Sequence, residues 1–249
     1  ITNTEEKPEI GVIHPISDIW LDYIRSEDEK SVRETEERFN EFMTVLRNNG
    51  VSYHFIDERI LSRHGKVENG VLKVGKSVYN TVIVPKMRNI ASPVYEILKD
   101  FDGKLCIIDK PIYIDGKREE ISLVGNTTLE EIIDGGRIKF RCDGGNGIMN
   151  ARSGEAGEFI FVKNTSYFEP CRIKIDGAEK KYRVLNLETL EESDIMDEMV
   201  IPPSESLILI RSEEAKRLNR SAFETEVTDD FKVINASENY FVMDMATLR

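Results

Sequence analysis

The chain has 249 residues, 40% of them hydrophobic and 32% charged, and its 46 acidic side chains outnumber the 34 basic ones. That hydrophobic fraction excludes a wholly disordered protein, and no apolar run approaches the roughly 20 residues that span a bilayer. The net charge of −12 repels nucleic-acid backbones and anionic membrane surfaces, so neither is expected as a partner.

The first half of the chain predicts strands that alternate with helices. One helix is predicted within 28–48, where the apolar spacing is amphipathic from Phe39 on and Asn49-Gly50 ends it, and a second begins at Ser92-Pro93 with Ser92 as its N-cap. Asn69-Gly70 is typical of a hairpin turn. The expected strands are Glu9–Ile16, Val51–Ile56, Thr81–Pro85 and Lys104–Asp109. Because these strands are apolar throughout and alternate with helices, a small doubly wound α/β domain, with a parallel sheet covered on both faces, is predicted over 8–117.

The second half predicts short antiparallel strands separated by turn residues. After a helix candidate at Thr128–Ile133, the expected strands are Ile138–Arg141, Glu158–Val162, Cys171–Ile175, Lys181–Leu187, Val200–Ile201 and Ser206–Ile210. Residues 118–212 therefore read as a small antiparallel β-sandwich domain. Residues 213–249 are interpreted as a linker and the start of a further, truncated β domain, so the chain is expected to be a piece of a longer one.

The three cysteines, Cys106, Cys142 and Cys171, lie far apart and show no CxxC spacing. They are interpreted as free buried thiols, which favours a reducing compartment, the cytoplasm, as does the lack of a recognisable secretory signal. The three histidines are too scattered to predict a metal site.

Ligands of open α/β sheets bind beyond the carboxyl ends of the strands. The polar residues expected there are His14, Ser17, Asp57, Glu58, Lys86 and Asp109. His14 is interpreted as a histidine bonded to backbone, with a ligand contact or a general base as the alternative. Asp57 and Glu58 are adjacent, so in a strand they would face opposite ways, and helix capping or a solvated turn is favoured over a paired-carboxylate site.

Trp20 follows the first predicted strand and has Tyr23 close by. A core or interface anchor is the favoured interpretation, and stacking on a sugar is the alternative. Four Asn-x-Ser/Thr triplets, at Asn126, Asn164, Asn219 and Asn235, are interpreted as chance matches rather than glycosylation sites.

Several motifs are missing from the sequence. No GxGxxG or P-loop follows any strand, so no nucleotide cofactor is expected. The third strand ends in Pro85-Lys86-Met87-Arg88, without the serine or cysteine of a nucleophile elbow.

The runs IGVIHPISDIWL (10–21), FNEFMTVLRNNGVSYHFIDE (39–58) and LKVGKSVYNTVIVP (72–85) resemble the middle region of large bacterial family 2-like glycoside hydrolases. The signatures are His14-Pro15-Ile16 and Leu72-x-Val74-Gly75-x-x-x-Tyr79. In those proteins a glutamine-amidotransferase-like, flavodoxin-type domain follows a catalytic (β/α)8 barrel, and sugar-binding sandwiches come later. The trimerisation domain of family 42 β-galactosidases is similar in kind.

The resemblance implies a role in carbohydrate metabolism. It does not imply the amidotransferase activity or the glycoside hydrolysis of the proteins that the chain resembles. The amidotransferase nucleophile is missing, and the catalytic carboxylate pair is expected on the barrel, which needs about 250 residues by itself. The chain is therefore expected to be a non-catalytic accessory region that braces the barrel, shapes the active-site rim or forms an oligomer interface. The expected partners are the barrel and sugar-binding domains of the full-length protein, an oligosaccharide and a second copy. The alternative is a stand-alone flavodoxin-like module that binds a small ligand through His14, Ser17, Trp20, Asp57, Glu58 and Lys86.

Overall fold

The structure is a computed structural model. It describes residues 4–6, 8–23, 29–135, 139–143, 147–154, 157–176, 182–186, 191–196 and 198–211. The predicted linker and third β domain, 213–249, lie outside the described residues, as do Asn219 and Asn235. Within the described residues, no helix is long and apolar enough to cross a membrane.

A four-stranded parallel sheet forms the centre of the first part of the chain. Its strands are β2 (Ile10–His14), β3 (His54–Asp57), β7 (Thr81–Val84) and β9 (Lys104–Ile107), in the order β3-β2-β7-β9. In register, Gly11 lies between His54 and Val82, and Ile83 pairs with Cys106. The predicted parallel strands are confirmed, each a little shorter than the apolar run that indicated it.

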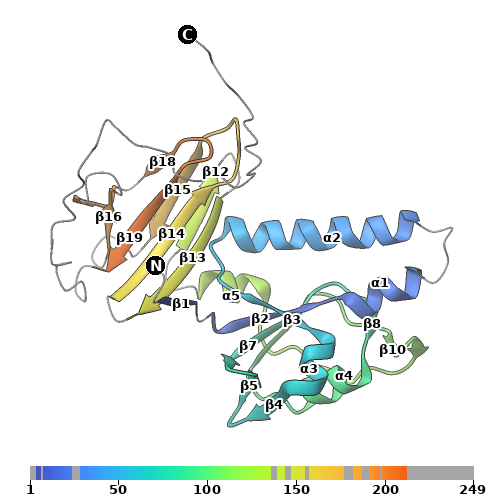
Figure 1. Cartoon of the computed structure of the whole chain (residues 1–249). Helices are drawn as coiled ribbons and strands as arrows, with labels where there is room; N and C mark the ends of the chain where they lie inside the picture. Colours follow the sequence, from blue (N-terminus) through green and yellow to red (C-terminus); the bar gives the residue numbers. More distant parts are fainter. Residues whose placement is uncertain are drawn as a thin grey trace, which may run out of the picture. The chain divides into compact units, whose positions relative to one another are not determined.

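Helices cover both faces of this sheet (Figure 1). They are α2 (Glu29–Asn48), α3 (Glu58–His64), α4 (Ser92–Lys99) and α5 (Leu129–Asp134), and a further helix, α1 (Ile16–Tyr23), follows β2. Successive strand residues point to opposite faces, so Ile13 packs in the cluster that includes Leu61 and Leu98, whereas Val12 packs with Met43 and Leu46. The result is a buried sheet between α3 and α4 on one face and α2 and α5 on the other.

Two small sheets flank the parallel one. β4 (Gly65–Glu68), β5 (Val71–Val74) and β6 (Ser77–Tyr79) form a meander, and the turn at Asn69 (φ 53°) and Gly70 (φ 75°) is left-handed, as the Asn-Gly signal predicted. β8 (Asn89–Ile90), β10 (Tyr113–Ile114) and β11 (Lys117–Arg118) form the second.

Residues beyond 117 also contribute to the α/β core. Ile121 and Leu123 are buried with the α3–α4 cluster, and Leu129 and Ile132 of α5 pack against the opposite cluster. Thr128 caps α5 in a capping box with Glu131, which is the physical reason that the predicted helix at 128–133 forms.

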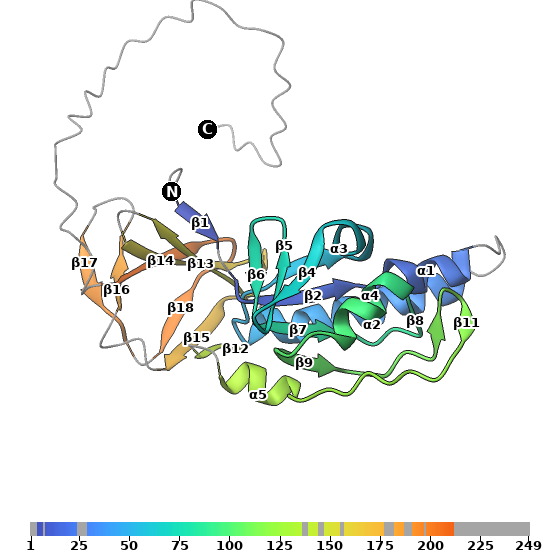
Figure 2. The same cartoon turned by 90° about the horizontal axis from the view of Figure 1, so that it is seen from below.

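The second part of the chain forms, with the N-terminal strand β1, a β-sandwich of two antiparallel sheets (Figures 1 and 2). One sheet has the order β1-β13-β14-β19-β16-β17 and the other β12-β15-β18. The strands are β1 (Thr4–Glu6), β12 (Lys139–Asp143), β13 (Gly147–Gly154), β14 (Gly157–Asn164), β15 (Cys171–Asp176), β16 (Tyr182–Leu185), β17 (Glu192–Asp194), β18 (Met199–Ile201) and β19 (Ser206–Arg211). Ile160 and Leu209 from the first sheet meet Ile173 and Ile201 from the second in one buried cluster.

Several local predictions are wrong. The helices α1 and α3 were not predicted, because each follows a strand directly and is too short to show a helical period. Ala91, not Ser92, is the N-cap of α4, with Ser92 and Pro93 in its first turn. The strands β1, β8, β10, β11, β13 and β17 were also missed.

The interpretation of all three cysteines as free thiols is wrong for Cys171. Cys171 is disulfide-bonded and fully buried at the start of β15, whereas Cys106 is free and buried. Burial raises the pKa of the Cys106 thiol to about 11, which keeps it protonated and unreactive. The side chain of Cys142 lies outside the described residues. The cysteines therefore no longer favour a reducing compartment.

Candidate functional site

Glu58 is the centre of a hydrogen-bonded cluster at the carboxyl edge of the parallel sheet. Its side chain is buried, and it accepts hydrogen bonds from the backbone N–H of Ser17 (2.8 Å), the hydroxyl of Ser17 (3.0 Å) and the backbone N–H of Ala91 (3.1 Å). Glu58 opens α3, Ser17 lies in the first turn of α1 and Ala91 is the N-cap of α4. One carboxylate therefore joins the starts of three helices.

Burial raises the pKa of Glu58, because removing the carboxylate from water disfavours its charged form. The hydrogen bonds from Ser17 and Ala91 act in the opposite direction and lower the pKa, but desolvation is the larger effect. A carboxyl with a raised pKa can serve as a general acid or base. Here both oxygens are already engaged by donors within the fold, which is the pattern of a structural carboxylate.

Two further buried polar side chains extend the cluster. Asn89 donates to the carbonyl of Ser17 (3.1 Å) and accepts from the backbone N–H of Gly116 (2.9 Å). Asp18 accepts from the Nε of Arg88 at 3.0 Å, in an ion pair whose carboxylate is 1% exposed. The cluster thus connects the segment after β2 with the segments after β7 and β10.

A small pocket of about 80 Å³ lies beside this cluster. It brings together three of the predicted site residues, Ser17, Trp20 and Glu58, and its remaining lining residues are Ile16, Arg59, Ser62, Ala91 and Pro93. Trp20 is 51% exposed, so the prediction of a core anchor is wrong, and an interface anchor or a stacking surface is what its position allows.

The other predicted residues lie apart from this pocket. Asp57 caps α3 by accepting from the backbone N–H groups of Arg59 (2.8 Å) and Ile60 (2.9 Å), so the predicted helix cap is confirmed for this residue. His14 lies among aromatic rings, with centroids 5.4 Å from Phe39 and 5.7 Å from Phe55.

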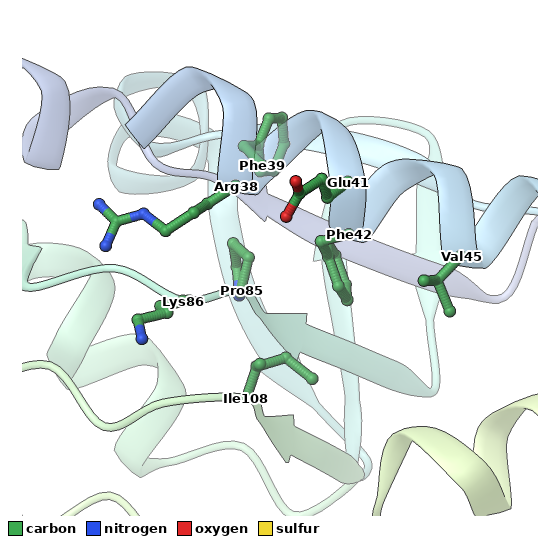
Figure 3. A pocket seen from close by; sticks show the side chains of 8 residues that line it. All are labelled: Arg38, Phe39, Glu41, Phe42, Val45, Pro85, Lys86 and Ile108. Atoms are coloured by element: carbon green, nitrogen blue, oxygen red, sulfur yellow. The ribbon is translucent and has the colours of Figure 1, made fainter. Parts of the chain in front are cut away.

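Lys86 lines a second, larger pocket of about 360 Å³ between α2 and the ends of β7 and β9. Phe42 of α2 lies opposite Pro85 and Ile108, with Val45 at one end of the space and Arg38 and Lys86 toward the other (Figure 3). Lys86 forms an exposed ion pair with Asp109 at 3.5 Å. This volume is in the range of small-ligand sites.

The chemistry of this edge differs from that of an amidotransferase. The segment after β7 carries Lys86 and the buried Met87 where a nucleophile would be needed. The Ser17 hydroxyl lies within hydrogen-bond distance of Glu58 and of the Asn89 carbonyl (3.2 Å), so it is held inside the cluster. Among the described residues, no group of three or more His, Cys, Asp or Glu side chains could hold a metal ion.

The structure adds Asn89, Asp18, Arg88 and Ala91 to the residues that organise the edge. Arg88 was in the segment after the third predicted strand, and its charge within a mostly apolar stretch was an available signal. Asn89, Asp18 and Ala91 gave no signal, because their role depends on short helices that the sequence pattern did not reveal.

The sequence matches no protein-family model and no curated protein sequence. Among solved structures, it is similar to a catalytic mutant of Gan42B, a GH42 β-galactosidase from G. stearothermophilus, with a TM-score of 0.50 and 10% identity over 83% of this chain and 40% of that one. A β-galactosidase from Bacillus circulans sp. alkalophilus matches with a TM-score of 0.46 and 12% identity, over 83% of this chain and 42% of that one. A rhamnosidase from Novosphingobium sp. matches with a TM-score of 0.46 and 12% identity, over 68% of this chain and 20% of that one.

The chain spans less than half the length of each of these proteins. The match to the first β-galactosidase covers more of this chain than the α/β part or the sandwich contains alone, so both parts contribute to it. The chain thus has an α/β-plus-β fold that is similar to part of the structure of that β-galactosidase.

Proposed function

We propose that the chain is a non-catalytic accessory region of a glycoside hydrolase, with a flavodoxin-like α/β domain followed by a small β-sandwich. The single observation that carries this proposal is the fold similarity to 40% of a GH42 β-galactosidase. The observed strand order β3-β2-β7-β9, which is 2-1-3-4 in order of appearance, supports the flavodoxin-like assignment.

The state of the carboxylates supports a non-catalytic role. Glycoside hydrolysis needs two carboxyl groups that flank the scissile bond. Asp57 is engaged as a helix cap, Glu58 accepts three hydrogen bonds inside the fold, and Asp18 is paired with Arg88. These carboxylates of the sheet edge are used to hold the fold together.

The exposed aromatic face of α1 supports a role in assembly. Trp20 and Tyr23 are three residues apart, so they share one face of the helix, and they are 51% and 75% exposed. Large aromatic side chains are enriched at protein interfaces. This face is proposed to pack against a catalytic barrel or a second copy of the chain.

Sedimentation velocity tests the assembly role. The purified chain is expected to self-associate as its concentration rises, or to bind a separately added barrel domain of the same protein. Both effects are expected to weaken in the double variant Trp20→Ser, Tyr23→Ser. If the chain stays monomeric and does not bind the barrel domain, this assembly role is overturned.

The second candidate function is a small-ligand module, and the specific observation that favours it is the pocket of about 360 Å³ below α2. Its lining is largely apolar, with Arg38, Glu41 and Lys86 as the charged residues, which suits a small ligand that has an apolar body and polar groups. A thermal shift with nucleotides but not with neutral sugars, lost in Lys86→Ala, would favour this alternative.

A further inference from the structure

Two aromatic side chains stand almost fully in solvent on the loop between β14 and β15. Tyr167 is 80% exposed and Phe168 is 88% exposed, which makes them the most exposed large hydrophobic side chains among the described residues. Each ring leaves a large apolar area in contact with water, and burying this area against a partner would release free energy.

The loop that carries them is held at both ends. At one end Asn164, which is fully buried, donates to the carbonyls of Glu169 (2.8 Å), Ile201 (3.1 Å) and Pro202 (3.1 Å). At the other end, Cys171 is fully buried and disulfide-bonded. These anchors leave only six residues between two fixed points.

Hydrogen bonds also order the interior of the loop. The side-chain oxygen of Asn164 accepts from the N–H of Ser166 (2.9 Å), and the hydroxyl of Ser166 accepts from the N–H groups of Phe168 (3.3 Å) and Glu169 (3.0 Å). The Ser166 carbonyl accepts from the N–H of Ser204 in the neighbouring turn (2.9 Å). The backbone beneath the two rings is therefore fixed before any partner arrives, which lowers the entropic cost of binding.

The polar side chains near Tyr167 and Phe168 indicate which class of ligand this surface would bind. Glu169, Ser204 and Glu205 are exposed beside the two aromatic residues, in the loop and the turn that it contacts. Exposed carboxylates and a hydroxyl accept hydrogen bonds from sugar hydroxyl groups, and the carboxylates repel anionic ligands. A neutral saccharide presents both the apolar ring face and the hydroxyl donors that this surface matches.

We propose that loop 165–170 and the adjoining turn 202–205 bind neutral saccharides, with Tyr167 and Phe168 as stacking residues. This inference rests on the proposed function for its class of ligand. It concerns the sandwich part, whereas the assembly role was assigned to α1, so the two proposals fail in different experiments.

The test is saturation-transfer NMR on the 249-residue chain with three probes: a β-1,4-linked galactotetraose, cellotetraose and an anionic oligogalacturonate. Transfer to at least one neutral probe is expected and none to the oligogalacturonate. In the double variant Tyr167→Ala, Phe168→Ala, the affinity is expected to fall about tenfold or more, since exposed ring anchors carry most of such contacts. Both side chains are exposed, so the variant should fold, and its circular dichroism and urea midpoint verify this.

Trp20→Ala is the competing aromatic variant. Binding retained in Trp20→Ala and lost in the loop variant supports the proposal, and the reverse result overturns it in favour of the pocket on α1. The absence of transfer to both neutral probes overturns it, as does equal transfer to the anionic one. Self-association that disappears only in the loop variant would show a protein-docking surface instead.

Discussion

The carboxyl edge of the parallel sheet and the β14–β15 loop are each organised by one buried polar side chain. Glu58 accepts three hydrogen bonds from the starts of α1 and α4, and Asn164 makes four with its amide. They differ in what they support. Around Glu58 the hydrogen-bonding groups turn inward and join helices, whereas Asn164 supports two aromatic rings that face solvent. What a buried polar side chain contributes to function therefore depends on the structure that it holds in place.

Asn164→Ala is expected to have the largest effect on stability. The variant leaves three buried or partly buried carbonyls and one N–H without their partner, and we expect a loss of about 3 kcal/mol in the free energy of unfolding. Urea denaturation followed by circular dichroism measures this change. Asn40→Ala, at an exposed position on α2, is the control and should stay within about 0.5 kcal/mol of the parent.

Glu58→Gln is expected to lower the free energy of unfolding by about 2 kcal/mol at neutral pH. The reason is that the NH2 group of the amide would face a backbone N–H from which the carboxylate accepts a hydrogen bond. The folded-state pKa of Glu58 is raised, so the native protein holds this proton more tightly than the unfolded chain. The stability that this proton contributes is fully present below the pKa that Glu58 has in the unfolded chain. It is lost as the pH rises through the pKa that Glu58 has in the folded protein.

The stability difference between the parent and Glu58→Gln should therefore be larger at acid pH than at neutral pH. Urea titrations of both proteins across this range measure it. A difference that grows as the pH rises would show that the hydrogen bonds, and not desolvation, dominate the pKa of Glu58.

Ser17→Ala tests the hydrogen bonds of Glu58 with a smaller change. It removes the hydroxyl donor at 3.0 Å but keeps the backbone N–H, so a loss of about 1 kcal/mol is expected. Ser62→Ala, an exposed serine on the neighbouring helix, serves as the control. Equal effects of the two variants would mean that the hydroxyl of Ser17 does not support Glu58.

Lys86→Ala is expected to have the smallest effect. The ion pair with Asp109 is more than half exposed on both sides, and such pairs contribute about 0–1 kcal/mol before screening by salt. The urea midpoint should remain unchanged within error. A clear loss of stability would show that the exposed groups at this edge hold the fold as the buried ones do.

The sequence predicted those parts of the fold that have a clear local pattern of residues. The four parallel strands, α2, the Asn69-Gly70 turn and the capped helix α5 each have a local signal strong enough to read directly. The strand β1 has none, because its three residues are polar and pair with β13 across almost 150 positions of sequence. Such long-range pairing is decided by the partner strand and not by local propensity.

The location of the candidate site could be predicted from the sequence, but the burial of Glu58 could not. The strand-end rule located Ser17 and Glu58, which line one pocket together with Trp20, a residue singled out as an exposed or anchoring aromatic. It could not show that Glu58 is enclosed, since the helices that enclose it are short and follow their strands without a loop. The ligand-binding roles of these residues, and of His14, Asp57 and Lys86, stay predictions. The triplets at Asn126 and Asn164 are occupied by internal hydrogen bonds of their side chains, in agreement with chance matches.

The non-catalytic role is tested most directly by the turnover of chromogenic glycosides, including p-nitrophenyl β-galactoside and α-rhamnoside, by the purified chain. We expect no release of nitrophenol above the buffer rate, because the carboxylates at the sheet edge are engaged in holding the fold. Saturable turnover that is abolished by Glu58→Gln or by Asp57→Asn, in a variant that remains folded, would contradict it.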